Sequence, residues 1–117
     1  SGLMKIIFPH NEATELEIFT PVKIANKIIP KGRYTLFCVP SENRWTIIVS
    51  KDNFCWGSFT YDTRNDMVRA DIKRETTNEI VETSTIYFNE NAGKANLVML
   101  WDNQRAGLPM TLVTNKK

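Results

Sequence analysis

Histidine and cysteine are scarce in this 117-residue sequence, which contains one of the first and two of the second. His10 has no second histidine with which to share a metal ion, and Cys38 and Cys55 match neither a metal-ligand spacing nor a CxxC motif. The sequence also lacks a glycine-rich phosphate loop and a serine in a nucleophile elbow. It therefore predicts no cofactor, no metal site and no catalytic residue of these kinds.

Long apolar runs and clusters of basic residues are missing as well. No apolar stretch approaches the roughly 20 residues that a transmembrane helix needs. The formal net charge is +2, but Lys and Arg are scattered among Asp and Glu along the whole chain. Because nucleic-acid binding requires a basic patch, the sequence predicts neither a nucleic-acid partner nor a transmembrane segment.

Both cysteines are expected to be reduced and to lie in or near the core. Cys38 stands within an apolar run, where small buried thiols are common. A disulfide between Cys38 and Cys55 is the alternative in an oxidising compartment.

Helical periodicity is absent, and short runs rich in Val, Ile, Thr and aromatic residues alternate with turn residues. This pattern predicts strands at residues 14–19, 22–24, 33–39, 45–50, 58–61, 67–74, 80–89, 95–102 and 108–114. The predicted fold class is all-β, an antiparallel β-sandwich of about eight to nine short strands. A flattened β-barrel is the alternative.

Two hairpins are expected to supply much of the core. If residues 40–44 form the first loop, Val39 faces Trp45, Phe37 faces Ile47 and Thr35 faces Val49. A slip of one residue would exchange the two faces. The second hairpin, around residues 89–94, aligns Ile86 and Phe88 with Ala95, Leu97, Met99 and Trp101, which places Trp101 in the core.

The chain is read as one domain. Residues 1–10 form an N-terminal segment whose Ser1-Gly2 is consistent with a tag remnant, residues 11–114 form the β-sandwich, and residues 115–117 are a tail. Pro109 falls inside the last predicted strand, so that part of the strand is expected at a sheet edge or a bulge.

Four segments, "NEATE", "IPKGRYTLFCVPSENRWTIIVSKD", "WGSFTYD" and "LVMLWDNQRAGLPMTL", resemble a bacterial family known as domain of unknown function 2911. The resemblance runs from Asn11 to Thr114. It implies a β-sandwich, and a periplasmic or cell-surface location because members are typically exported; a cytoplasmic location stays open. No activity is established for the family.

This chain departs from the family pattern at two places. It has "IIFPH" where members carry a Trp-Arg-Thr-Gly-Ala element before Asn-Glu-Ala-Thr. Cys38 and Cys55 also stand where other small or polar residues are expected, which argues against a family disulfide.

The candidate ligand-binding residues are Asn11, Glu12, Thr14, Trp56 and Tyr61. In one interpretation they form a binding rim, with Glu12 as acceptor and Trp56 as stacking surface. In the other, the polar residues satisfy backbone groups at a strand corner and the aromatics pack against the domain.

Three functional hypotheses follow. The first is a non-catalytic module of an exported bacterial protein that binds a carbohydrate, lipid or protein ligand. The second is a small carboxylate-dependent hydrolase with Glu12 as the acid. The third is a structural domain that forms a homodimer through an exposed edge strand.

Overall fold

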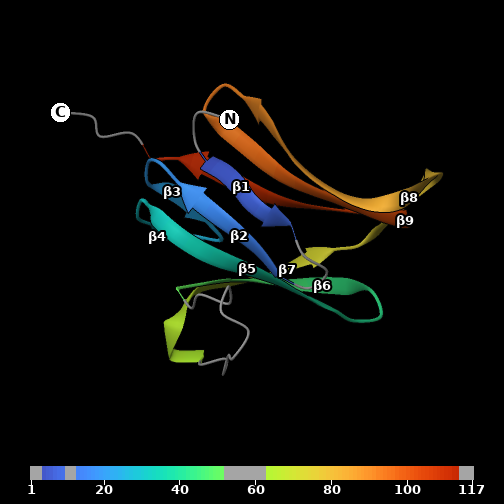
Figure 1. Ribbon diagram of the computed structural model, residues 1–117, viewed down its shortest axis with the longest axis horizontal. Coiled ribbons are helices and arrows are strands. Elements are labelled where there is room, and N and C mark those ends of the chain that lie inside the picture. The colour runs from blue at the N-terminus through green and yellow to red at the C-terminus, as the bar shows by residue number, and fades with distance from the viewer. Residues whose placement is uncertain (1–3, 10–12, 52–62, 114–117) are drawn as a thin grey trace.

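Two antiparallel sheets lie face to face in the computed structural model, which describes residues 4–9, 13–51 and 63–113 (Figure 1). The first sheet has the strand order β1-β2-β5-β6-β7 and the second has the order β4-β3-β9-β8. The strands are β1 (Met4–Pro9), β2 (Ala13–Ile18), β3 (Val22–Ile24), β4 (Lys27–Ile29), β5 (Gly32–Pro40), β6 (Arg44–Ser50), β7 (Asp66–Lys73), β8 (Glu75–Asn91) and β9 (Lys94–Leu112). The predicted β-sandwich is confirmed, and the described strands do not close into a barrel.

One short 3-10 helix, η1 (Thr63–Asn65), precedes β7. Among the described residues, no helix is long and apolar enough to span a membrane.

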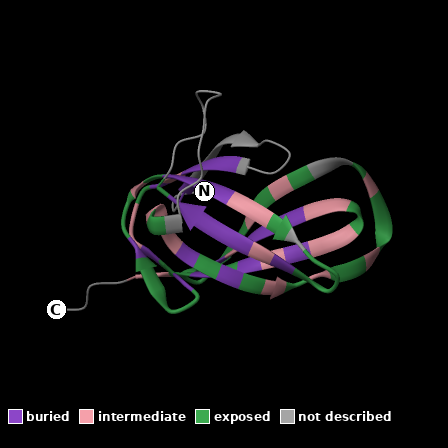
Figure 2. Cartoon of the chain, turned by 90° about the horizontal axis from the view of Figure 1, so that it is seen from below, coloured by how far each residue is buried: buried purple, intermediate pink, exposed green. Residues whose placement is uncertain are grey.

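The core forms between the sheets because alternate residues of each strand face inward. Leu16 and Ile18 of β2, Leu36 of β5 and Ile47 of β6 are buried on the inner face of the first sheet. Leu108 of β9 is buried on the facing sheet. Figure 2 shows buried residues within the strands of both sheets, alternating in places with exposed ones, and mostly exposed residues in the turns.

The register predicted for the β5–β6 hairpin is wrong by one residue. The structure pairs Val39 with Thr46, Phe37 with Ile48 and Thr35 with Ser50. The hairpin closes tightly, since the Ser41 N–H donates to the Arg44 carbonyl over 2.8 Å. The face carrying Tyr34, Leu36, Cys38, Trp45, Ile47 and Val49 is therefore the inner one.

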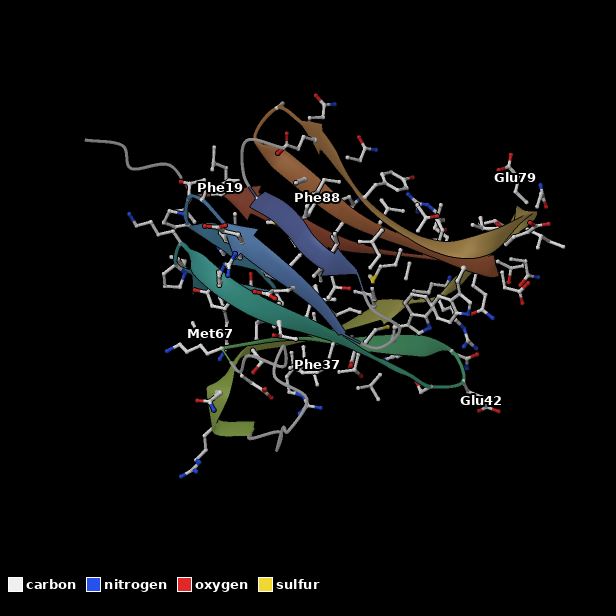
Figure 3. The ribbon with its side chains drawn as sticks, viewed as in Figure 1. Phe19, Phe37, Glu42, Met67, Glu79 and Phe88 are labelled. Atoms are coloured by element: carbon white, nitrogen blue, oxygen red, sulfur yellow. The ribbon has the colours of Figure 1, made fainter. Side chains whose placement is uncertain are left out.

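The two faces of this hairpin are both largely apolar, which explains the error. Phe37 and Ile48, which the structure places on the outer face, look in the sequence like core residues (Phe37 is labelled in Figure 3). Because register is strongly specified only where one face alone is apolar, periodicity could not choose between the two alignments here.

The second predicted hairpin is confirmed. Ile86 pairs with Met99 and Phe88 with Leu97, joined by a turn in which Ala92 and Gly93 both have positive φ. Figure 3 labels Phe88, one of the partly buried residues of β8 that pack against the core.

Strand β9 doubles back on itself, where the sequence predicted two strands separated by a break. The Leu112 N–H donates to the Gly93 carbonyl over 2.8 Å, so the end of β9 lies beside its beginning. Asp102, with φ of 50°, marks the reversal. In Figure 1 the last part of β9 (red) returns from the far end of the sheet to reach β3.

Two tryptophans connect the sheets. Trp45 of β6 is fully buried, and its ring stacks on that of Trp101 of β9 with centroids 3.7 Å apart and planes at 15°. The core position predicted for Trp101 is confirmed, although its side chain stays partly exposed.

Cys38 is a free, half-buried thiol, as expected, and burial raises its pKa to about 11. Cys55 lies outside the described residues.

The sequence did not predict β1 and β4. β4 pairs with β3 across a turn formed by Ala25 and Asn26, whose φ angles are 48° and 68°. β1 (MKIIFP) shows no regular alternation, and β4 has only three residues. The strand predicted at residues 58–61 lies outside the described residues.

Candidate functional site

Of the five candidate ligand-binding residues, the structure describes only Thr14. It lies in β2 and is 2% exposed, on the inner face that also carries Leu16 and Ile18. Asn11, Glu12, Trp56 and Tyr61 lie outside the described residues. The structure points instead to two other features, a cavity at the seam between the sheets and a polar row on the outer face of the first sheet.

The seam cavity has a volume of about 450 Å³ and lies where β7, the last strand of the first sheet, meets the second sheet. Its lining comes from three places in the chain: the β3–β4 hairpin, the middle of β7 and the end of β9. The residues are Lys23, Ala25, Asn26, Ala70, Asp71, Ile72, Leu108, Pro109 and Thr111. The volume falls within the range of small-ligand sites, roughly 300–1,000 Å³.

The cavity has an apolar floor and a polar mouth. Ala70 and Leu108 are buried, whereas Lys23, Asn26 and Thr111 are exposed at the rim. A few polar groups around an apolar hollow are typical of sites that bind small molecules. The arrangement can exclude water from an apolar group while offering charge and hydrogen bonds at its edge.

Three consecutive residues of β7 line the cavity, which shows that the cavity faces the edge of this strand. Ala70 and Ile72 point inward and Asp71 outward, because side chains alternate along a strand. Only the strand edge can present all three residues to one space. The Asp71 carboxylate accepts a hydrogen bond from the Thr46 hydroxyl over 2.7 Å.

The ladder between β6 and β7 fixes the direction of the backbone groups at this edge. The Arg74 N–H donates to the Asn43 carbonyl over 3.3 Å, so these two residues form a hydrogen-bonded pair. Such pairs alternate with non-bonded ones in antiparallel sheets. It follows that Asp71, paired with Thr46, directs its N–H and C=O away from β6 and toward the cavity.

Pro109 lies on the opposite wall, at the point where pairing between β3 and β9 ends. Lys23 pairs with Thr111, and the next residues of β3 turn away at Ala25. Because proline has no N–H, it cannot extend this ladder. β9 lies between β3 and β8 in its sheet, but Pro109 stands beyond the last pair with β3 and borders the seam cavity, which fits the expected local edge or bulge.

The second feature is a row of polar residues across four strands on the outer face of the first sheet. Glu15, Thr35, Ser50 and Asp66 are lateral neighbours in β2, β5, β6 and β7. The first three are buried, and the Asp66 side chain is only 9% exposed. Buried polar residues on an outer face are unusual, because that face is ordinarily solvated.

An arginine accompanies the carboxylate at each end of this polar row. Arg33 lies 3.6 Å from Glu15, and Arg69 lies 3.6 Å from Asp66. The two carboxylates stand on strands three spacings apart, about 14 Å at the usual strand separation. That is well beyond the roughly 5–9.5 Å between paired glycosidase carboxylates, so this pair does not form such a dyad.

Sequence reasoning missed both features. Turn residues such as Asn26 and a strand proline are visible in the sequence, but a cavity depends on which strands meet across the seam. One signal was available: Pro109 predicted an edge or a bulge, and unpaired edges are where other chains bind.

Within the described ranges, no three His, Cys, Asp or Glu residues gather closely enough to hold a metal ion.

The comparisons place the chain in a family without assigning it a reaction. No curated protein and no solved structure matches it. The profile of the family described as "Protein of unknown function (DUF2911)" matches residues 9–110, which is most of the chain and includes all the cavity-lining residues except Thr111. The resemblance found in the sequence is thereby confirmed: this chain belongs to the DUF2911 family.

Proposed function

We propose that this protein is a non-catalytic β-sandwich module that binds a ligand in the seam cavity, as part of an exported bacterial protein. The observation that carries the proposal is the cavity of about 450 Å³ with an apolar floor and a polar rim. The family's typical export supports the setting. The volume and the lining of the cavity are compatible with a carbohydrate, a lipid or a protein ligand.

A thermal-shift screen against glycans, lipids, peptides and small metabolites tests the proposal. A ligand present at about a hundredfold over its Kd adds roughly 2.7 kcal/mol of stability. Unfolding entropy scales with length, so in 117 residues this is about 10 °C in Tm. Binding in the seam cavity predicts a shift of this size for at least one ligand class.

Two variants restrict the test to the seam cavity. Ala70→Leu places a larger side chain on the floor, and Thr111→Phe places a ring at the mouth. Val39→Phe is the matched control, because Val39 is exposed on β5 and does not line the cavity. Each variant is compared with its own ligand-free Tm, since added volume at Ala70 costs about 1–3 kcal/mol.

We expect the shift to disappear in Ala70→Leu and Thr111→Phe and to persist in Val39→Phe. A screen without any shift would contradict the proposal. So would a shift that both cavity variants retain in full, because the ligand would then bind elsewhere.

A further inference from the structure

We infer that the ligand of the seam cavity is an extended peptide, which binds as an added strand along the free edge of β7. This inference rests on the proposed function and narrows it to one ligand class. Among the strands that the structure describes, β7 pairs with β6 alone. It is the last strand of the first sheet, and its residues 70–72 line the cavity.

The backbone of β7 offers hydrogen bonds at the right spacing. Arg69, Asp71 and Lys73 are paired with β6 residues in the non-bonded positions of the ladder, so their N–H and C=O groups point outward. A peptide strand would bond to these groups in the manner of β-augmentation. Main-chain bonds would supply affinity, and pockets for alternate side chains would supply specificity.

The seam cavity provides such a pocket. In an added strand, the side chains opposite Ala70 and Ile72 point between the sheets, toward the cavity floor at Leu108. Every second peptide residue is therefore expected to be apolar and of moderate size. Burying such a side chain removes apolar surface from water and so favours binding.

The opposite wall explains why a peptide in the seam cavity would pair with β7 and not with β9. The edge of β9 that faces the seam contains Pro109, which has no N–H to donate. β9 can therefore form at most part of a ladder at this point, because Pro109 retains only its carbonyl as a backbone hydrogen-bonding group. The two walls have different roles, with hydrogen bonds from β7 and apolar contact from β9.

The outward side chains of β7 define the charge of the partner. Arg69, Asp71 and Lys73 are exposed and alternate in sign: positive, negative, positive. Opposite charges directly across an antiparallel pair stabilise it, and like charges destabilise it. The complementary outward pattern is acid, base, acid, and it reads the same in either strand direction.

These two requirements specify a probe. It is an acetylated and amidated heptapeptide with the sequence threonine, glutamate, valine, lysine, valine, glutamate, threonine. Three controls accompany it: a peptide with all three charges reversed, a peptide with N-methylation at the central lysine, and a scrambled peptide. Binding is followed by the amide NMR signals of β7 and by calorimetry.

Two variants of the protein test the backbone contact. Asp71→Pro removes the outward N–H but no bond to β6, because the Asp71 N–H points away from that strand. Asp71→Asn is the matched control, since it keeps the N–H and the side-chain size. We expect Asp71→Pro and the N-methylated peptide each to weaken binding at least about tenfold, and Asp71→Asn to weaken it less.

Binding of the probe to the unaltered protein and to the two Asp71 variants provides independent tests of the inference. Failure of the probe to perturb the amides of unaltered β7, or equal binding to Asp71→Pro and Asp71→Asn, would overturn it. Self-association that sedimentation detects in the unaltered protein and that Asp71→Pro abolishes would also overturn it, because a second copy would then be the partner.

The outcome can be separated from that of the proposed function. One informative result is a ligand that raises Tm in the unaltered protein and in Asp71→Pro but not in Ala70→Leu. That result would support ligand binding in the seam cavity and contradict strand addition along β7. The absence of any ligand in the screen would remove the proposed function itself.

Discussion

The stack of Trp45 on Trp101 joins the two sheets directly, and its contribution to stability can be measured. We consider Trp45→Leu, Trp101→Leu and the double variant. Each substitution removes one ring of a pair whose centroids are 3.7 Å apart. Leucine retains part of the apolar volume, so the fold is expected to survive.

The magnitudes follow from burial. Truncating a buried tryptophan to alanine costs about 3–5 kcal/mol. Trp45→Leu, at a fully buried site, is expected to cost about 2–4 kcal/mol, toward the lower end because the indole N–H finds no hydrogen-bond partner among the described residues. Trp101→Leu is expected to cost about 1–2 kcal/mol, since Trp101 is partly exposed.

The contribution of the stack itself is measured as the interaction free energy between the two substitutions. Stacked aromatic pairs contribute about 0.5–1.5 kcal/mol beyond the area that they bury. The double variant is therefore expected to lose less stability than the sum of the single variants, by about this amount.

Urea denaturation followed by far-UV circular dichroism measures the three losses without depending on the tryptophan signal. Trp45→Leu combined with Ile28→Ala is the control, because Ile28 is 59% exposed on β4 and outside the core cluster. That pair should be additive. Strict additivity of the two tryptophan variants would refute the stacked arrangement.

Three smaller predictions concern single residues. Tyr34→Phe removes a 2.6 Å hydrogen bond to the Pro30 carbonyl and should cost about 1 kcal/mol, measured as a fall of about 4 °C in Tm; an unchanged Tm would contradict the bond. Ala92→Asn creates an Asn-Gly pair where both φ angles are positive and should stabilise the domain by about 0.5–1 kcal/mol in urea denaturation, whereas a loss would contradict the turn. In a variant that lacks the other cysteine, Cys38 at pH 8 should be alkylated about tenfold more slowly than an ordinary thiol. A pKa of about 11 instead of 9.0 lowers the thiolate fraction about a hundredfold, and greater nucleophilicity offsets part of that. The rate should rise with pH until about pH 11, and a plateau near pH 9 would contradict the burial of this thiol.

Fold class was accessible from the sequence because turn residues and β-branched runs mark strands locally. The pairing of Phe88 with Leu97 was predicted correctly, since a short turn at Ala92 and Gly93 determines it. The register of β5 and β6 was wrong because Phe37 and Ile48 make the outer face resemble a core.

The candidate site was less accessible, for a different reason. A cavity forms where strands distant in the sequence come together in space. Lys23, Ala70 and Pro109, which line this one, come from three such segments. The doubling back of β9 at Asp102 brings one wall into place, and the sequence predicted a loop there. Residue types alone could indicate an edge at Pro109 but not what faces it.

Amide hydrogen exchange along β7, with and without the probe heptapeptide, is the decisive test of strand addition. Exchange is expected to slow at Arg69, Asp71 and Lys73, whose N–H groups face the seam, and to change little at Ala70 and Ile72, whose N–H groups already bond to β6. Unchanged exchange at all five residues, or equal slowing at all five, would contradict the addition of a strand at this edge.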